Sequence, residues 1–314
     1  MKNVLITGGA GYIGSLLSDT LVNLNYNVTV VDNMYFKKNT IGHLIIKKNF
    51  KFILDDSRNK ELINELLKKN DVIIPLACLV GAPLCDKYPI EAKEVNQDAI
   101  VHIIKSKSKD QIILYPNTNS GYGSTEKDVE CNENMPLNPI SIYGKTKCVV
   151  ENELMQNENV TSFRLATVFG SSFRNRVDLL VNFFVYNALF EKKLVLFEPE
   201  FRRNYIHVRD IVNTFLFAID NFDSVKNNIY NVGLSSANLT KIELCKKIKE
   251  HIKDFNFEIS HEGTDPDKRD YFVSNKKIES LGWKPKISLD DGIKELTQVY
   301  KLISKKDFDQ NYQK

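Results

Sequence analysis

The sequence predicts an α/β fold, with a doubly wound parallel sheet in the first half and a smaller mixed α/β lobe after it. Two observations predict this fold. Short apolar runs alternate with helical patterns up to about Arg164, and a glycine-rich turn follows the first of these runs. Alternating strands and helices are typical of a parallel sheet that is covered by helices on both faces. Beyond Arg164, polar stretches interrupt the pattern, as is typical of insertions that build a second lobe.

The individual elements follow from short runs of residues. Runs rich in Val, Ile, Leu and Phe predict strands at residues 4–6, 28–31, 50–54, 72–74 and 112–114. Apolar residues at helical spacing predict helices at residues 12–24, 60–69, 90–105, 143–155, 179–190, 239–252 and 289–303. We expect residues 1–170 to form the sheet domain, to which the chain returns at about 205–235. The smaller lobe is then expected from residues 171–204 and 236–314.

Composition argues against several classes of protein. The 314 residues include 43 basic and 40 acidic side chains, so a net charge of +3 gives no broad field that would attract nucleic acid or an anionic membrane. No apolar run approaches the roughly 20 residues of a membrane-spanning helix, and the first residues do not predict a secretory leader. Five cysteines without a CxxC pair are typical of reduced thiols in a cytoplasmic protein, and they indicate neither disulfides nor a metal site.

The glycine-rich turn opens the first predicted helix. Gly8, Gly11 and Gly14 allow a tight turn and the close approach of a pyrophosphate. The backbone N–H groups of Tyr12 and Ile13 lie at the helix N-terminus, whose partial positive charge attracts phosphate. This context predicts a Rossmann-type dinucleotide site. An ordinary turn is the alternative, because glycine patterns alone are common.

Asp32 ends the second predicted strand, eighteen residues after Gly14. Its carboxylate can accept hydrogen bonds from the adenosine ribose hydroxyls, and Asn33 follows it. A carboxylate at this position would repel the 2′-phosphate of NADP, so the sequence favours NAD. Lys37 and Lys38 leave NADP open, and a solvated Asp at a strand end is the other alternative.

A phenol and an ammonium group lie at helical spacing in the fourth predicted helix. Tyr143 and Lys147 are four residues apart, so both side chains face the same side of the helix. A phenol is a poor base near pH 7, but a neighbouring cation favours the phenolate. The loop after the fifth strand supplies Thr118, whose hydroxyl could orient a substrate oxygen while Tyr143 takes its proton. An exposed helix face is the alternative, because this spacing is common by chance.

Together these segments resemble the extended short-chain dehydrogenases that act on nucleotide sugars, a family of epimerases, 4,6-dehydratases and dehydrogenases. The resemblance covers nearly the whole chain and includes residues 203–210, which are similar to the family's Arg-x-Tyr-Ile-His-Val segment. It implies NAD as cofactor, with Tyr143 and Lys147 beside it, and Thr118, Tyr143 and Lys147 as catalytic residues. It also implies further cofactor contacts at Asp56, Ser57, Leu76, Ala77 and Asn96.

Within the family, residues 75–85, 201–205 and 265–271 resemble the members that oxidise a GDP-linked heptose. That resemblance implies oxidation of the C4 hydroxyl of GDP-D-glycero-α-D-manno-heptose to a ketone, in the synthesis of bacterial capsule heptoses. A 4-epimerase of UDP- or GDP-sugars with tightly bound NAD is the alternative, because the same three catalytic residues serve both reactions. A non-catalytic NAD-binding module is a second alternative.

Substrate contacts are carried over from the family position by position. The residues expected to bind substrate are Val80, Thr118, Asn119, Ser120, Asn182, Arg203 and Arg269. Arg203 and Arg269 form the expected diphosphate clamp, since a guanidinium fork suits phosphate oxygens. Asp178 and Asp265 stand where the family often has a phosphate-binding Asn and Arg, so Asn182 and Arg269 are expected to replace them.

The residues after Thr118 disfavour dehydration. Asn119 and Ser120 occupy the places where 4,6-dehydratases carry an Asp-Glu pair, and neither side chain exchanges protons readily near pH 7.

We also expect a homodimer, because helices 90–105 and 143–155 carry more apolar residues than one sheet face needs. These residues are Ile100, Ile103, Ile104, Val149, Val150 and Leu154. The alternative is that they line the core of the single chain.

Overall fold

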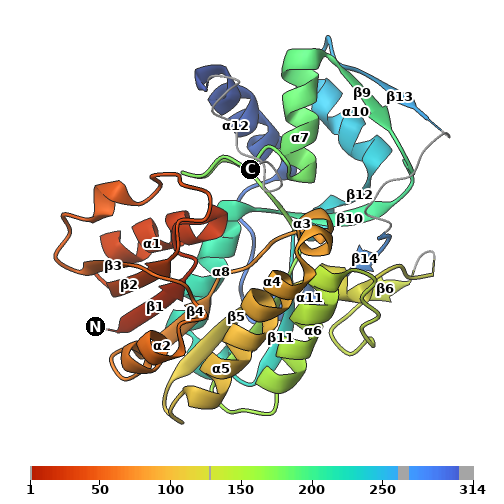
Figure 1. The fold of residues 1–314 in the computed structure, drawn as a ribbon. Coiled ribbons are helices and arrows are strands. Elements are labelled where there is room, and N and C mark those ends of the chain that lie inside the picture. The colour runs from red at the N-terminus through yellow and green to blue at the C-terminus, as the bar shows by residue number, and fades with distance from the viewer. Residues whose placement is uncertain (1, 127–128, 261–268, 304–314) are drawn as a thin grey trace.

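A seven-stranded sheet forms the centre of the structure, a computed structural model that describes residues 2–126, 129–260 and 269–303 (Figure 1). Its order is β11-β7-β5-β4-β1-β2-β3, and all neighbouring strands run parallel. The strands are β1 (Asn3–Thr7), β2 (Asn27–Asp32), β3 (Phe50–Leu54), β4 (Val72–Pro75), β5 (Ile112–Thr118), β7 (Val160–Leu165) and β11 (Asn228–Val232). The predicted strands and the Rossmann-type fold are confirmed.

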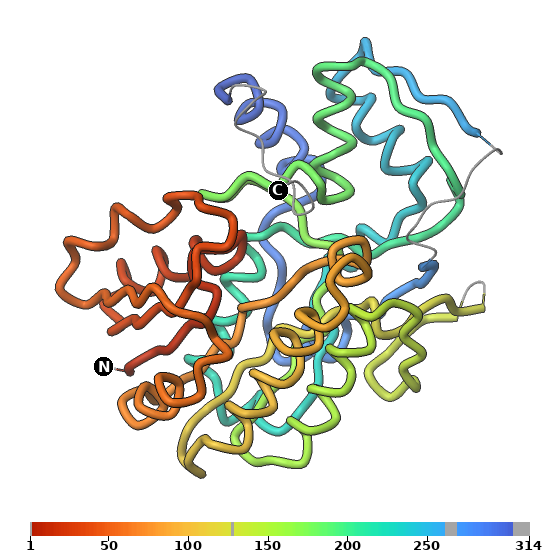
Figure 2. The backbone as a smooth tube through the Cα atoms, in the orientation of Figure 1, coloured from red at the N-terminus to blue at the C-terminus, as the bar shows by residue number. Residues whose placement is uncertain are grey.

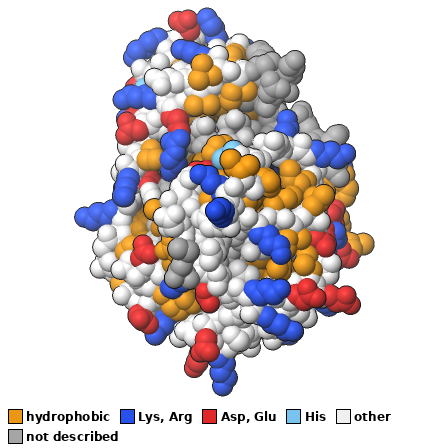
Figure 3. Space-filling view, turned by 90° about the vertical axis from the view of Figure 1, so that its left-hand side faces the viewer, with side chains coloured by type: hydrophobic (Ala, Val, Ile, Leu, Met, Phe, Trp, Pro, Cys, Tyr) orange, Lys and Arg blue, Asp and Glu red, His pale blue; other side chains and the backbone are white. Residues whose placement is uncertain are grey.

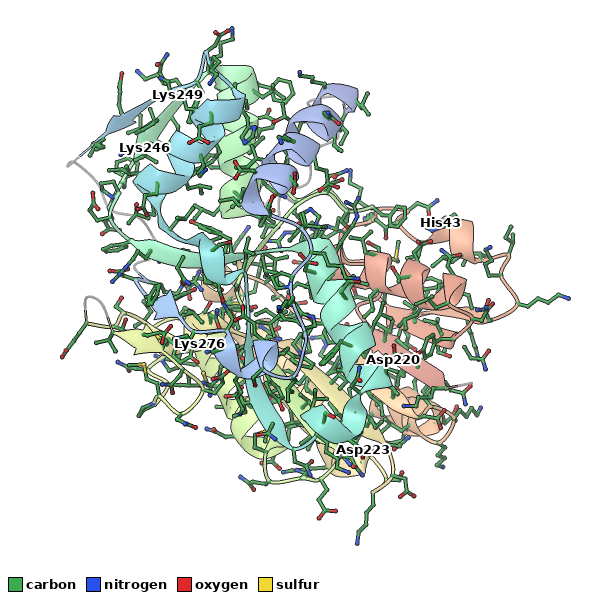
Figure 4. The ribbon with its side chains drawn as sticks, turned by 180° about the vertical axis from the view of Figure 1, so that it is seen from behind. His43, Asp220, Asp223, Lys246, Lys249 and Lys276 are labelled. Carbon is green, nitrogen blue, oxygen red and sulfur yellow. The ribbon has the colours of Figure 1, made fainter. Side chains whose placement is uncertain are left out.

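Helices cover both faces of this sheet, because successive side chains of a strand point to opposite sides. Val4 and Ile6 of β1 belong to the apolar core on one face, and Leu5 between them belongs to the core on the other. The first face is covered by α1 (Tyr12–Asn23) and α8 (Val208–Asp220), and the second by α2 (Lys60–Leu67), α5 (Ala99–Ser106) and α6 (Ile142–Leu154). Figure 4 shows α8 across the rear of the sheet, with Asp220 near one end.

Two predicted helices contain a π-helical turn. The helix predicted at 90–105 consists of α4 (Pro89–Lys93), the π-helical η2 (Glu94–Asp98) and α5. The helix predicted at 179–190 consists of α7 (Leu180–Tyr186) and the π-helical η4 (Asn187–Glu191). A π turn widens the helix by one residue, which hydrophobic spacing over a short window does not reveal. It also changes the direction in which the side chains of η2 point.

The second lobe has a separate apolar core, and Figure 2 shows it as a body of green and blue segments beside the sheet. Its strands are β8 (Thr167–Phe169), β9 (Lys193–Leu196), β10 (Arg202–His207), β12 (Asn238–Thr240) and β13 (Asn256–Ile259). β10 pairs with β8 and β12, and β9 pairs with β13. Helices α7, α10 (Lys241–His251) and α12 (Leu289–Leu302) pack on this core.

The remaining elements are short helices and strands in the connecting segments. They are η1 (Gly42–Leu44), α3 (Ala82–Lys87), η3 (Asn119–Tyr122), β6 (Glu130–Cys131), α9 (Phe222–Val225), η5 (Ser235–Ala237), β14 (Phe272–Val273) and α11 (Lys276–Glu279). Ile278 of α11 and Trp283 pack in the same core as β1 and α8. These two residues, which were predicted to belong to the smaller lobe, therefore pack in the core of the sheet. The other predicted domain boundaries stay predictions.

Asp210, near the start of α8, fixes the segment that precedes α12. Its buried carboxylate accepts hydrogen bonds from the backbone N–H groups of Lys286 (2.9 Å) and Ile287 (3.0 Å). We expect Asp210→Asn to lower the free energy of unfolding by about 2 kcal/mol, because an amide nitrogen cannot accept and hydrogen bonds to charged groups are worth about 1.5–3 kcal/mol. Urea unfolding measures this change. Asp223→Asn, at an exposed side chain (Figure 4), should leave the value nearly unchanged, and equal losses would contradict the prediction.

The surface carries charges of both signs. Basic and acidic side chains are interspersed over the face drawn in Figure 3, in keeping with the near balance of 43 basic and 40 acidic residues. Among the residues that the structure describes, no helix combines the length and the apolar composition needed to cross a membrane.

Candidate active site

A cavity of about 740 Å³ opens at the carboxyl ends of the sheet strands, next to the second lobe. The sheet side of its wall includes Gly8, Asp32 and Thr118, and the lobe side includes Leu196 and Arg203. Ligands of open parallel sheets bind at this edge. The volume also falls in the range of about 300–1,000 Å³ that small-molecule sites usually have.

The predicted glycine turn lines this cavity and requires glycine for steric reasons. A Cβ atom on Gly8, whose φ is +75°, would lie 2.5 Å from the backbone nitrogen of Ala77. A Cβ atom on Gly14 would lie 2.3 Å from the Gly8 carbonyl oxygen. Helix α1 has no side-chain cap at its N-terminus, so its first N–H groups suit an anion such as a pyrophosphate. The same wall includes Gly11, Tyr12 and Ile13.

Asp32 lies in the cavity wall at the end of β2. Its carboxylate accepts hydrogen bonds from the N–H groups of Ala10 (3.0 Å) and Met34 (2.8 Å), and so joins the glycine turn to the loop after β2. Burial raises the pKa of Asp32 above its ordinary value, and these two hydrogen bonds oppose the rise. Carboxylate oxygens have several lone pairs, which leaves capacity for a ribose hydroxyl.

Asp56 and Ser57 extend the same wall after β3. Arg58 Nε donates to Asp56 Oδ1 (2.9 Å), and Asn33 Nδ2 donates to Asp56 Oδ2 (2.9 Å). Burial raises the pKa of Asp56, but the hydrogen bonds from Arg58 and Asn33 and the charge of Arg58 together hold that pKa below its ordinary value. Three of the predicted cofactor contacts, Asn33, Asp56 and Ser57, thus form one stretch of polar wall.

The loop after β4 forms the next part of the wall, with Leu76, Ala77 and Val80. Asn96 does not line the cavity and is fully buried behind this loop. Its amide accepts from the backbone N–H of Leu79 (2.8 Å) and donates to the carbonyl of Leu79 (2.9 Å). In this structure its polar atoms hold the loop, and the direct cofactor contact expected at Asn96 stays a prediction.

Thr118, Tyr143 and Lys147 all line the cavity, although they come from two elements. Thr118 ends β5, and its hydroxyl lies 2.9 Å from the hydroxyl of Ser120. Tyr143 and Lys147 lie on α6, and Lys147 Nζ donates to the carbonyl of Pro116 at 2.8 Å. The fold thus brings a hydroxyl, a phenol and an ammonium group to one wall.

Burial raises the pKa of the Tyr143 phenol well above its ordinary value, and the neighbouring thiols of Cys78 and Cys85 add to the rise. Arg269 and Arg176 oppose it. Without additional positive charge in the cavity, this phenol is protonated at neutral pH. A base at this position therefore depends on cations that approach it.

Two expected substrate contacts lie outside the cavity wall. Asn119 is fully buried in η3, while its neighbour Ser120 lines the cavity. Asn182 is buried in α7, where it accepts from Gly170 N (2.9 Å) and donates to Arg176 O (2.8 Å). Asn182 therefore fixes the backbone between β8 and α7. Neither side chain lines the cavity in this structure, and the direct substrate contacts expected at Asn119 and Asn182 stay predictions.

Cationic side chains gather on the lobe side of the cavity. Arg203 and Arg269 line it, and the Arg203 guanidinium lies 5.3 Å from the centre of the Tyr271 ring. Asp178 also lines it, as one partner of a buried ion pair with Arg176. This pairing explains how a carboxylate is accommodated there. The structure adds Arg174, Arg176 and Lys241 to the wall, and Asp265 lies outside the described residues.

Residues 171–176, called the strap below, contact the glycine turn and the loop after β2. Ser172 Oγ donates to the carbonyl of Tyr12 (2.6 Å), and the Phe173 ring lies 4.9 Å from the ring of His43. The Arg174 guanidinium lies 3.4 Å from the centre of the Phe36 ring. Figure 2 shows the green strap beside the red N-terminal part of the chain. The strap thus covers one side of the cavity near Asp32.

A doubly wound sheet with a glycine turn at its carboxyl edge defines a Rossmann-type dinucleotide-binding protein. More narrowly, the chain belongs to the NAD-dependent epimerase/dehydratase family, whose model matches residues 4–233. The family is NAD-dependent, and the prediction of NAD as the cofactor is confirmed.

Known relatives match nearly the whole chain. A putative UDP-glucose 4-epimerase of Methanocaldococcus jannaschii is 27% identical over 310 residues, which are 95% of this chain and 98% of that protein. The dTDP-D-glucose 4,6-dehydratase of Mus musculus is 25% identical over 322 residues, 96% of this chain and 89% of that protein.

Solved structures share the fold over the same length. The UDP-glucose 4-epimerase of Thermotoga maritima with UDP-glucose superposes with a TM-score of 0.80 at 25% identity, and covers 96% of this chain and 99% of its own. The dTDP-glucose 4,6-dehydratase of Bacillus anthracis in complex with NAD gives 0.82 at 23% identity, over 98% and 99%.

Proposed function

We propose that this chain oxidises the C4 hydroxyl of a nucleotide sugar to a ketone, and that the sugar is GDP-D-glycero-α-D-manno-heptose. The observation that carries the proposal is the cavity itself. Thr118, Tyr143 and Lys147 share its wall with the arginines Arg203 and Arg269, which suit a diphosphate. The resemblance of residues 75–85 and 201–205 to GDP-heptose dehydrogenases supports the particular sugar. Five free cysteines support action in the cytoplasm.

The proposed chemistry divides one proton transfer among these side chains. Tyr143 takes the proton of the C4 hydroxyl, and Thr118 orients the same oxygen by a hydrogen bond. The Lys147 ammonium, held at 2.8 Å by Pro116 O, favours the phenolate form of Tyr143. Bound NAD supplies the acceptor for the hydride from C4. Because burial raises the pKa of Tyr143, positive charge near the phenol is needed for base function near pH 7.

The geometry around Thr118 disfavours dehydration. A 4,6-dehydratase needs a general acid and base beside the sugar, whereas Ser120 is engaged with the Thr118 hydroxyl and Asn119 lies behind the cavity wall. We therefore propose oxidation at C4 without elimination of water.

The test is product analysis by mass spectrometry. The purified protein with excess NAD is incubated separately with GDP-D-glycero-α-D-manno-heptose, GDP-mannose and UDP-glucose, and borodeuteride then traps any ketone. We expect a deuterium label at C4 of the heptose only. Turnover of another nucleotide sugar alone would contradict the substrate, and turnover of none would support a non-catalytic NAD-binding module.

A 4-epimerase is the second candidate, and the strap favours it. An epimerase keeps its cofactor through both hydride transfers, so slow release of NAD is an advantage. The Arg174 guanidinium contacts the Phe36 ring, and both line the cavity with Asp32. The adenosine half of NAD is proposed to bind there. An isomeric sugar of unchanged mass in the product analysis would establish this candidate in place of the dehydrogenase.

Arg174 is expected to slow the release of NAD. A desolvated cation–π contact is worth about 2 kcal/mol, so Arg174→Ala should speed NAD dissociation by at least about tenfold. The measurement is the fraction of bound NAD that remains after timed gel filtration. Arg209→Ala is the matched control, because Arg209 pairs with Glu295 and does not line the cavity. Equal release from both variants would contradict a role of the strap in retention.

We also propose a homodimer through α4 and α6. Five of the six apolar residues expected at the interface are buried in the core of the chain, and Val149 alone among them is exposed. Ile90 adds a second exposed apolar side chain on α4. Sedimentation equilibrium at micromolar concentration should give twice the chain mass for the wild type and the monomer mass for Val149→Glu. A monomeric wild type would contradict the proposal.

A further inference from the structure

Helix α6 is connected to the end of β5 at two successive residues. Lys147 Nζ donates to the carbonyl of Pro116 at 2.8 Å. One turn further along α6, Glu151 Oε2 accepts from Asn117 Nδ2 at 2.6 Å. Because Lys147 and Glu151 are four residues apart, they face the same side of the helix. Two hydrogen bonds made by side chains of α6 therefore fix the distance between this helix, which carries Tyr143, and the strand that ends at Thr118.

The Asn117 amide continues this connection to Thr118. Its Oδ1 atom accepts from the backbone N–H of Thr118 at 2.8 Å, while its Nδ2 atom donates to Glu151. Asn117 is almost fully buried, so water does not compete for these bonds. A movement of the Glu151 carboxylate would therefore move the backbone of Thr118.

Glu151 is itself fixed from the neighbouring strand β7. Arg164 donates to Oε1 of Glu151 through Nε (3.1 Å) and Nη2 (2.7 Å), and Ser162 Oγ donates to Oε2 at 2.6 Å. All three side chains are buried. A buried ion pair is a poor source of net stability, since desolvation offsets the attraction. Its place behind the cavity wall points to a role in geometry.

We propose that Glu151 and Asn117 are positioning residues that hold the Thr118 hydroxyl in register with the Tyr143 phenol. This inference rests on the proposed function, because it concerns the two groups that share the substrate oxygen. Neither residue needs to exchange a proton. They contribute by aligning the Thr118 hydroxyl at the end of β5 with the Tyr143 phenol on α6. Small misplacements of reacting groups lower the reaction rate strongly.

The experiment compares Asn117→Ala with Ser162→Ala. Each variant removes one donor that lies 2.6 Å from Glu151 Oε2, but only Asn117 continues to Thr118. We expect kcat of Asn117→Ala to fall about 100-fold with KM nearly unchanged. Ser162→Ala leaves both Arg164 hydrogen bonds to Glu151 and the Asn117 hydrogen bond in place, so its kcat should stay within about threefold of the wild type. The melting temperatures of the two variants should nevertheless fall by similar amounts.

A charge exchange tests whether Asn117 acts through Glu151. Asn117→Asp alone places two carboxylates together and should lose activity. The double variant N117D/E151Q restores a donor at 151 and an acceptor at 117, so kcat should recover at least about tenfold over N117D. A residue at 117 that acted only by touching the substrate would show no such recovery.

Three results would overturn the inference. One is wild-type kcat in Asn117→Ala, another is an equal loss of kcat in Ser162→Ala, and the third is no recovery in the double variant. Failure of the proposed function has a different signature, because the wild type itself would then oxidise no nucleotide sugar. That last result would overturn both.

Discussion

Tyr143→Phe is expected to lower kcat by about 10³-fold, since general acid–base groups contribute roughly 10²–10⁴-fold. The phenol lines the cavity with Thr118 and Lys147, and phenylalanine keeps the ring while removing the oxygen that we propose takes the proton. We therefore expect the variant to retain bound NAD. Initial rates with the nucleotide sugar give kcat, and mass spectrometry of the purified variant gives the bound cofactor.

Tyr115→Phe is the control for that prediction. Tyr115 is fully buried, its hydroxyl donates to the Lys147 carbonyl at 3.4 Å, and it does not line the cavity. Its kcat should stay within about threefold of the wild type, because a single long hydrogen bond contributes little. Undiminished turnover in Tyr143→Phe would show that another group takes the proton, and a loss of NAD would show that the phenol is needed for binding.

Arg164→Met is expected to lower the free energy of unfolding by about 3–5 kcal/mol, the usual effect of leaving one partner of a buried ion pair alone. Arg164 and Glu151 are both buried, and their closest atoms are 2.7 Å apart. Arg164 also donates to the hydroxyl of Tyr122 at 3.0 Å. Methionine fills part of the space but leaves the Glu151 carboxylate without its cation. Urea unfolding followed by circular dichroism measures the change.

An exposed ion pair provides the comparison for Arg164. Lys193 and Glu258 lie 3.1 Å apart with more than half of each side chain exposed. Exposed pairs contribute little because water and salt screen them, so Lys193→Met should unfold at nearly the wild-type urea concentration. If both variants lost the same stability, burial would not be the cause of the effect.

The sheet and the glycine turn could be predicted because local residues determine them. Apolar runs such as residues 28–31 are long enough to form buried strands, and the turn at Gly8 and Gly14 tolerates no Cβ atom. Thr118, Tyr143 and Lys147 lie in one wall of the cavity because β5 and α6 are neighbours in the fold. The alternation of strands and helices in the sequence had already predicted that order of elements. The regular order of strands and helices thus determines where these side chains lie.

The amides were harder to predict, because their partners are backbone atoms of irregular loops. Asn96 lies in a π turn that points it at Leu79, and Asn182 binds Gly170 and the Arg176 carbonyl. Neither the π turn nor the course of these loops has a sequence pattern that reveals it. The contact of Arg174 with Phe36 joins residues far apart in the chain, which helix and strand periodicity cannot indicate.

The strap has a thermodynamic consequence for the order in which ligands bind. It touches the glycine turn at Tyr12, and directly after it Asp178 enters the lobe side of the cavity. If a nucleotide sugar that contacts the lobe tightens this segment and so strengthens NAD binding, NAD must strengthen sugar binding by the same factor, because coupling free energies are reciprocal. Under such coupling the complex with both ligands is more stable than the two separate affinities alone would give.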